Sequence, residues 1–216
     1  MSSKNRHALL EAPTPQSPPA ARSDKISYEE FLARDFEGRL AEWVDGEVIT
    51  MTVSSEHQEL TIFLTALLRF YAEAHESGRV FGEPFQMKTS PELPGRSPDL
   101  FFVATKRLSK LKKHYFDGPA DLVIEVISPE SRARDRGEKF YEYEQGGVKE
   151  YWLIDPQRRQ AEFYQRSRKG IYQVVQPDAA GRYHSAVLKG LWIRTDWLWQ
   201  EPLPPLVKIL KEWGLV

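Results

Sequence analysis

The chain has 216 residues, of which 41% are hydrophobic and 28% charged, which is apolar material for one core rather than two. Thirty Lys and Arg residues nearly balance 31 Asp and Glu residues, so a nucleic acid or an anionic lipid surface must meet a local basic patch. The lack of cysteine excludes disulfides, thiolate metal sites and cysteine nucleophiles. No apolar run approaches the roughly 20 residues of a bilayer span, and we expect a cytoplasmic protein without a membrane partner.

The N-terminal segment differs in composition from the rest of the chain. Residues 1–24 are rich in Pro, Ala and Ser and contain few large apolar side chains, so we expect a flexible N-terminal tail. Residues 25–216 are expected to form a single domain. At its start, Ser27 and Glu30 have the spacing of a capping box, which predicts a short helix.

The dipeptide Asp45-Gly46 separates two short apolar runs and predicts a tight β-hairpin, because both residues tolerate positive φ angles. With a two-residue turn, Val44 pairs with Glu47 and Glu42 pairs with Ile49. Glu42 and Glu47 should then project from one face of the hairpin.

Apolar spacing predicts the later elements. A long helix is expected from Ser54 to about Ser77, and another over residues 131–146 that ends at Gly146-Gly147. Buried strands are expected in RVFGEPFQMKT, PDLFFVA, ADLVIEVIS and VKEYWLID. The segments QAEFYQR, GIYQVVQP and SAVLKGLWI indicate an antiparallel extension, and PPLVKILKEWG a final helix. The fold class predicted is α/β (α+β).

Three polar residues fit this apolar pattern poorly. Asp99 follows Pro98 at the start of one strand, and Glu125 interrupts another, where a carboxylate is costly to bury unless it is paired or binds a metal. Lys139 lies in the helix that follows the Glu125 strand. Each has an ordinary explanation: a turn residue for Asp99, an ion pair or a solvated position for Glu125, and a surface lysine for Lys139. Together they could bind a divalent cation beside an ammonium group.

Several segments together resemble one known family. They are EWVDGE, an isolated His at the start of the long helix, PDLFFV, DLVIEVISPES, and DRGEKFxxY followed by GGVKEYWLIDP. Over residues 28–199 the chain resembles the Uma-type branch of restriction-endonuclease-like proteins, members of the PD-(D/E)xK nuclease superfamily. The resemblance implies a mixed central sheet flanked by helices, with an N-terminal β-hairpin and an antiparallel extension, and a metal-dependent site at the sheet edge.

The resemblance also implies roles for individual residues. Asp99 matches the acid of the PD element, and Glu125 matches the second acid. Ile127 stands where the family lysine usually follows, and Lys139 matches a lysine that has migrated to the next helix. The implied metal ligands are Asp99, Glu125 and the backbone carbonyl of Val126. Further implied catalytic positions are Glu42 and Glu47, one of which would complete the metal shell or hold its water, and His57 at the start of the helix.

The activity implied is hydrolysis of phosphodiester bonds in DNA with Mg²⁺ or Mn²⁺ as cofactor. The metal would polarise the scissile phosphate and activate water, and Lys139 would orient that water or stabilise developing charge. Whether the DNA is duplex or single-stranded stays open. His57 has the alternative of a polar helix residue that hydrogen-bonds the hairpin.

A basic segment follows the Asp99 strand, and we expect it to contact phosphates near the site. Its cations are Lys106, Arg107, Lys110, Lys112 and Lys113. An amphipathic helix with Leu108 and Leu111 toward the core explains the same pattern. A homodimer is a further hypothesis, with weak support from tryptophans that core packing explains equally well.

Two alternatives to an active enzyme stay open. One is a catalytically inactive nucleic-acid-binding or interaction module of the same fold. The other is a structural role in which Glu125 and Lys139 form a buried ion pair without metal affinity.

Overall fold

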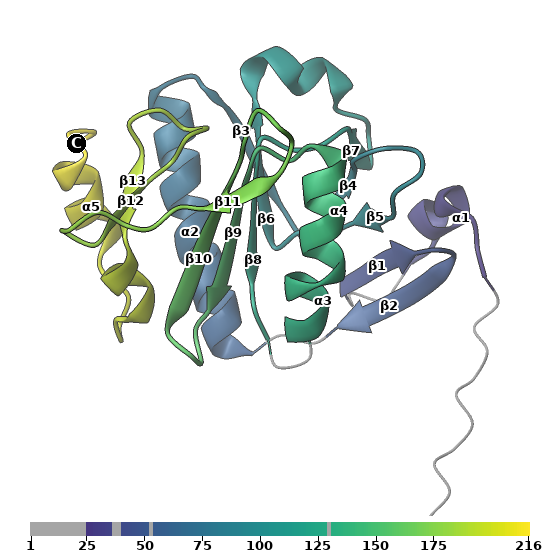
Figure 1. Ribbon diagram of the computed structural model, residues 1–216, viewed down its shortest axis with the longest axis horizontal. Helices are drawn as coiled ribbons and strands as arrows, with labels where there is room; N and C mark the ends of the chain where they lie inside the picture. Colours follow the sequence, from purple (N-terminus) through teal and green to yellow (C-terminus); the bar gives the residue numbers. More distant parts are fainter. Residues whose placement is uncertain (1–24, 36–39, 52–53, 129–130) are drawn as a thin grey trace, which may run out of the picture.

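The computed structural model describes residues 25–35, 40–51, 54–128 and 131–216. The predicted tail of residues 1–24 lies outside the described residues. A mixed six-stranded sheet forms the centre of the molecule, with helices on both faces (Figure 1). The predicted α/β class, with a mixed central sheet flanked by helices, is therefore confirmed.

The central sheet has the spatial order β11-β10-β9-β8-β6-β3. Its strands are β3 (Gly78–Gly82), β6 (Leu100–Ala104), β8 (Leu122–Val126), β9 (Glu150–Asp155), β10 (Gln160–Arg166) and β11 (Tyr172–Val174). The β8–β9 pair is parallel, and the other neighbouring pairs are antiparallel. The continuous apolar sequences of β6, β8 and β9 follow from burial on both faces.

Alternate residues of each strand pack into two separate cores. Leu100 and Phe102 of β6 lie in a first core with helix α2 (Ser55–Ala74), whereas Phe101 and Val103 lie in a second core. The helix begins after Ser54, whose hydroxyl accepts a hydrogen bond from the backbone N–H of His57. The long helix predicted from apolar spacing is confirmed.

A second sheet has the order β2-β1-β5-β4-β7. Its strands are β1 (Leu40–Val44), β2 (Glu47–Met51), β4 (Gln86–Lys88), β5 (Gly95–Arg96) and β7 (Tyr115–Asp117). The predicted hairpin register is confirmed, with Glu42 opposite Ile49, and Asp45 and Gly46 have φ angles of 49° and 92°. The capping box of Ser27 is present at helix α1 (Tyr28–Ala33).

The helix predicted over residues 131–146 is two helices, α3 (Arg132–Arg136) and α4 (Glu138–Gly146). Gly137 separates them with non-helical angles of φ −111° and ψ −87°, a break that a side chain at this position would have opposed. The predicted glycine stop is confirmed, since Gly147 adopts the left-handed conformation at φ 93°.

The strand predicted in RVFGEPFQMKT is interrupted at Glu83-Pro84, where Pro84 has no N–H for a ladder hydrogen bond. The two parts become β3 of the central sheet and β4 of the second sheet. The remaining helical segments are the 3-10 helices η1 (Thr105–Lys110) and η2 (Thr195–Trp199) and the predicted final helix α5 (Leu206–Glu212).

The predicted antiparallel extension is correct for β10 and β11 only. The third segment contributes to a separate two-stranded sheet of β12 (Arg182–His184) and β13 (Trp192–Arg194). Its first residues cannot form a strand there, because the buried carboxylate of Glu150 accepts hydrogen bonds from the Ser185 hydroxyl and from the backbone N–H groups of Ala186 and Val187.

The tryptophans considered as dimer contacts belong to the first core. Trp152 and Trp197 are buried, and Trp192 and Trp199 pack against the same cluster, so they give no support for a homodimer. No helix among the described residues is long and apolar enough to cross a membrane.

The hairpin turn yields a stability prediction. A Cβ at Gly46 would lie 2.9 Å from the Lys25 Cβ, in addition to the strain of its positive φ. Gly46→Ala should lower the free energy of unfolding by about 2 kcal/mol in urea denaturation. Gly214→Ala is the control, because Gly214 has φ 70° and open space around it, and it should lose about 1 kcal/mol. Equal losses would show that crowding at Lys25 has no effect.

Candidate active site

Three carboxylates follow one another across the end of the central sheet. Gly82 pairs with Leu100 and Leu100 with Ile124. Glu83, just after β3, and Asp99, just before β6, therefore lie in a row with Glu125 on β8. Neighbouring strands are about 4.8 Å apart. By strand alternation, all three residues belong to the face of the second core. We call these three residues the carboxylate row.

Asp99 is fixed from two sides. Its Oδ2 accepts a hydrogen bond from the backbone N–H of Val126 at 2.5 Å and lies 3.2 Å from Nε2 of His57. Both Asp99 and His57 are buried. The first turn of α2 therefore reaches the end of β6, and Asp99 is tied to the strand that carries Glu125.

His57 has a shifted proton affinity. Burial disfavours its charged form, but the hydrogen bond and negative charge of Asp99, with a smaller contribution from Glu83, outweigh burial and raise the pKa of His57 above its ordinary value. A raised pKa favours the imidazolium form, which donates to the Asp99 carboxylate.

Lys139 lies in a cluster of three carboxylates that we call the lysine cage. Its Nζ is 3.1 Å from Oε1 of Glu42, 3.1 Å from Oε1 of Glu125 and 3.2 Å from Oδ1 of Asp135. All four side chains are at most 3% exposed. The cage joins the hairpin, the central sheet, α3 and α4 at one point.

Tyr143 completes the environment of Glu125. Its hydroxyl donates a hydrogen bond of 2.7 Å to Oε1 of Glu125, the oxygen that also contacts Lys139. Lys139 and Tyr143 are four residues apart on α4 and therefore share one face of the helix. This oxygen of Glu125 is consequently held in place by two donors.

Arg96 links the cage to the rest of the fold. Its guanidinium is 1% exposed and donates to both carboxylate oxygens of Glu142 at 2.7 and 2.8 Å. The same group contacts Glu42 at 3.3 Å and Glu138 at 3.5 Å. Arg134 lies 3.7 Å from the same oxygen of Glu42. Arg96 thereby ties the hairpin to α4, the two elements that supply Glu42 and Lys139.

Neighbouring opposite charges keep both Glu42 and Lys139 in their ionised forms. Burial would raise the pKa of Glu42, but Lys139, Arg96 and Arg134 outweigh burial and hold this pKa below its usual range. Burial alone would lower the pKa of Lys139, yet Glu125, Glu42 and Asp135 raise it well above its ordinary value. Lys139 therefore stays an ammonium ion.

The cations near the carboxylate row do not fully balance its negative charge. Burial raises the pKa of Glu125 well above its ordinary value despite Lys139, and Asp99 and Asp135 add to the shift. Burial and the charge of Asp99 raise the pKa of Glu83 to about 8. An added cation at this end of the sheet would therefore be electrostatically favourable.

Of the residues selected from the sequence, the structure brings together Asp99, Glu125, Lys139, Glu42 and His57. Glu47 lies apart from them. It is exposed beside the hairpin turn, and within the described part of the chain no hydrogen bond or ion pair joins it to the cage.

The donor set suits a hard divalent cation. Within the described ranges, Oδ1 of Asp99 and Oε2 of Glu125 take no hydrogen bond, which leaves one free oxygen on each of two neighbouring strands. No group of three or more His, Cys, Asp or Glu side chains among the described residues forms a ready metal shell. Mg²⁺ commonly binds through one or two carboxylates and completes its shell with water and substrate phosphate, so these residues fit it.

The basic segment lies at the other end of the sheet, which corrects its expected position near the site. It follows the last residue of β6, whereas Asp99 precedes the first, a separation of about 20 Å along the strand (Figure 1). Arg107 contacts Asp121 at 3.1 Å and the Phe116 ring. The lysines of this segment are exposed: Lys106, Lys110, Lys112 and Lys113. Leu108 and Leu111 pack against the second core, as their spacing predicts.

Sequence reasoning missed Glu83, Arg96, Asp135 and Tyr143. Tyr143 and Asp135 each lie four residues from Lys139, so helical spacing could have indicated them. Glu83 joins Asp99 only through strand register, and Arg96 reaches α4 only through the tertiary fold. No local pattern identifies these two.

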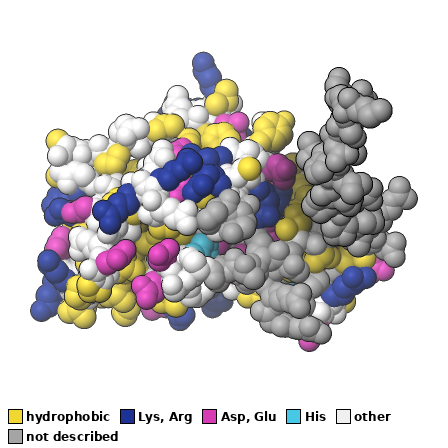
Figure 2. All heavy atoms as spheres, turned by 90° about the horizontal axis from the view of Figure 1, so that it is seen from below, with side chains coloured by type: hydrophobic (Ala, Val, Ile, Leu, Met, Phe, Trp, Pro, Cys, Tyr) yellow, Lys and Arg dark blue, Asp and Glu magenta, His cyan; other side chains and the backbone are white. Residues whose placement is uncertain are grey.

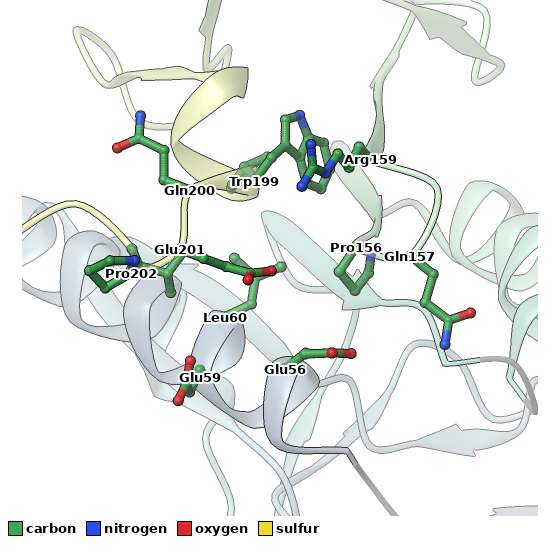
Figure 3. A pocket seen from close by; sticks show the side chains of 12 residues that line it. Glu56, Glu59, Leu60, Pro156, Gln157, Arg159, Trp199, Gln200, Glu201 and Pro202 are labelled. Atoms are coloured by element: carbon green, nitrogen blue, oxygen red, sulfur yellow. The ribbon is translucent and has the colours of Figure 1, made fainter.

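A pocket of about 640 Å³ lies beside the N-terminal turn of α2 and contains none of the carboxylate row (Figure 3). Its lining includes Glu56, Glu59 and Glu201 together with Arg159 and Trp199. The excess of carboxylates in this lining makes it a poor site for a phosphate group.

The fold that carries this row of carboxylates, a mixed sheet flanked by helices, is shared with a solved structure. Among solved structures, the chain is similar to one from Anabaena variabilis ATCC 29413 described as "a putative nuclease belonging to DUF820", with a TM-score of 0.66 and 18% sequence identity. The match covers 80% of this chain and 97% of that one. At this identity, the similarity shows a common fold.

The family follows from the sequence. The family model Uma2, described as "Putative restriction endonuclease", matches residues 28–196. The chain therefore belongs to the Uma2 family, as the resemblance of its motifs indicated. No curated protein has significant sequence similarity to it.

Removal of Lys139 should destabilise the fold. Lys139→Met leaves three buried carboxylates without their shared cation and should cost about 3–5 kcal/mol in urea denaturation. Lys149→Met is a matched control, because Lys149 is 52% exposed and its partner Asp121 keeps Arg107, so about 1 kcal/mol is expected. Equal losses would contradict a special role of the cage in stability.

Glu83 should make stability depend on pH. Its pKa is raised from 4.5 to about 8 in the folded protein, so its stabilising contribution is complete at low pH and is lost as pH rises through that interval. Glu83→Gln should therefore melt several degrees higher than wild type above pH 8 in EDTA, and the difference should vanish toward pH 4.5. A difference independent of pH would contradict this assignment.

Proposed function

We propose that this protein is a metal-dependent endonuclease that hydrolyses phosphodiester bonds in DNA. One observation carries the proposal: two buried carboxylates on neighbouring strands, Asp99 and Glu125, with the Lys139 ammonium 3.1 Å from Glu125. Membership of a family described as "Putative restriction endonuclease" supports it.

Asp99, Glu125 and the carbonyl of Val126 would hold Mg²⁺ or Mn²⁺ at the edge of the sheet. When bound, the cation supplies a Lewis acid for the scissile phosphate and lowers the pKa of its water. The free oxygens of Asp99 and Glu125 are the donors available for it within the described residues.

Lys139 contributes a fixed positive charge. Glu42 and Asp135 keep its ammonium charged and hold it against Glu125, so no reorganisation of this group is needed during the reaction. In the proposed reaction it orients the attacking water or stabilises charge that develops on the phosphate oxygens.

His57 and Tyr143 act by positioning. His57 contacts the Asp99 oxygen that also accepts the Val126 N–H, and Tyr143 donates to the Glu125 oxygen that faces Lys139. Each partner orients one carboxylate and leaves its second oxygen for the metal. Mutation of such partners typically weakens metal affinity by about 10- to 100-fold.

The first test is cleavage of plasmid DNA and of duplex and single-stranded oligonucleotides with Mg²⁺ or Mn²⁺. Asp99→Asn, Glu125→Gln and Lys139→Ala should each lower the rate by about 100-fold or more, because each removes a ligand or a charge used in the transition state. Asp117→Asn, an exposed carboxylate of β7, should leave the rate unchanged. Circular dichroism and melting confirm that each variant is folded.

Metal binding separates the alternatives. Mn²⁺ should raise the melting temperature of wild type and not that of Asp99→Asn, because a ligand of the folded state stabilises it by mass action. Folded wild type that binds Mn²⁺ and DNA without cleavage would indicate an inactive nucleic-acid-binding module. Folded wild type that neither cuts nor binds metal would leave Glu125 and Lys139 as a structural ion pair.

A further inference from the structure

We propose that Arg132 and Arg158 form a phosphate-binding surface for the DNA backbone beside the carboxylate row. This inference rests on the proposed function and names the contact that holds the substrate at the same site. Arg132 is the first residue of α3, and Arg158 lies in the turn between β9 and β10.

Strand register places this pair close to the candidate metal ligands. Glu125 on β8 pairs with Leu153 on β9, and Asp155 lies two residues further along β9. Asp155 therefore lies one strand over from Glu125 and about 8 Å from it. Alternation along β9 gives Leu153 and Asp155 the same face of the sheet, the face of α3 and α4.

Asp155 holds both arginines. Its carboxylate is fully buried and accepts from Nε of Arg132 at 3.1 Å and from Nη2 at 3.4 Å. It also accepts from the backbone N–H of Arg158 at 3.1 Å, and Nε of Arg158 lies 4.0 Å away. Within the described residues, two guanidinium groups thus share one carboxylate, which leaves a surplus positive charge.

Both guanidinium groups remain accessible to a ligand. The side chain of Arg132 is 25% exposed and that of Arg158 is 58% exposed, whereas Asp155 is not exposed. A buried acceptor that orients arginines with free N–H groups suits recognition of phosphate oxygens. Phosphate contacts of this kind give affinity and position without sequence preference.

Nearby arginines differ in their partners. Arg136 has an ion pair with Glu162, Arg134 faces Glu42 in the lysine cage, and Arg159 lies in the pocket that contains three glutamates. Seen from the end of the molecule where β8 ends and α2 begins, Lys and Arg side chains gather near the middle of the face, above a His side chain (Figure 2). Among the described residues, Arg132 and Arg158 therefore have Asp155 as their shared acid, and this acid contacts no lysine.

The basic segment after β6 provides a matched comparison. Lys106 and Lys110 are also exposed cations, but they lie in η1, which begins directly after the last residue of β6, at the opposite end of that strand from Asp99. A phosphate bound there is too far from the carboxylate row to be a neighbour of the scissile phosphate. The two patches therefore predict different effects of mutation.

The test measures binding of a fluorescent DNA duplex and the matching single strand in EDTA, where the affinity does not depend on metal, over a range of salt concentrations. Arg158→Gln should weaken binding and reduce the slope of log Kd against log salt by about 0.9, the value for one lost phosphate contact. Arg132→Gln combined with Asp155→Asn removes the second guanidinium without leaving an unpaired buried charge, and should have a similar effect. Lys106→Gln with Lys110→Gln is the control and should preserve the slope.

The outcomes separate this inference from the proposed function. Loss of affinity and slope in the arginine variants, with the lysine control intact, supports the surface. Folded arginine variants that bind like wild type, or a loss confined to the lysine variant, overturn it while the nuclease proposal stands. Wild type that binds neither DNA form in EDTA also overturns the surface, and the cleavage assay with Mg²⁺ or Mn²⁺ then decides the nuclease proposal separately.

Discussion

The structure depends on one buried ammonium ion. Lys139 makes contacts of 3.1 to 3.2 Å with carboxylates from the hairpin, the central sheet and α3, so elements that are distant in sequence meet at its Nζ. Burial of these charges is costly, and it is tolerated because each charge finds a partner. Arg96 extends the network by binding Glu42 and Glu142 together. The same contacts that stabilise the junction between the two sheets also arrange the groups used in the proposed chemistry.

The two ends of the central sheet carry different charged groups. At one end, β3, β6 and β8 bring their carboxylates into a row, α3 adds Arg132, and the turn after β9 adds Arg158. At the other end lie η1 and the exposed lysines, and Arg107 there binds Asp121 as a structural group. The antiparallel pairing of β6 with both neighbours explains this arrangement, because residues before β6 and after β3 must lie at the same edge.

Local chemistry explains which features were predictable from the sequence. Ser27 with Glu30, Asp45-Gly46 and Gly147 act within a few residues, and each forms the element that its residue types favour. Asp99, Glu125 and Lys139 were found through burial cost and resemblance to the Uma-type proteins. Glu83 and Arg96 could not be found, because their partners are set by register and by the docking of the second sheet. The basic segment was placed wrongly because closeness in sequence to Asp99 was taken as closeness in space, although an extended strand of five residues separates the two.

Gly137 interrupts the helical segment that supplies most of the lysine cage. Before it, α3 directs Arg132 to Asp155 and Arg134 to Glu42, and after it, α4 directs Lys139 and Tyr143 to Glu125. The contact between Asp135 and Lys139 bridges the two helices. Lys139 thus reaches Glu125 from a helix packed on the sheet, and the position two residues after Glu125 is left to the apolar, buried Ile127.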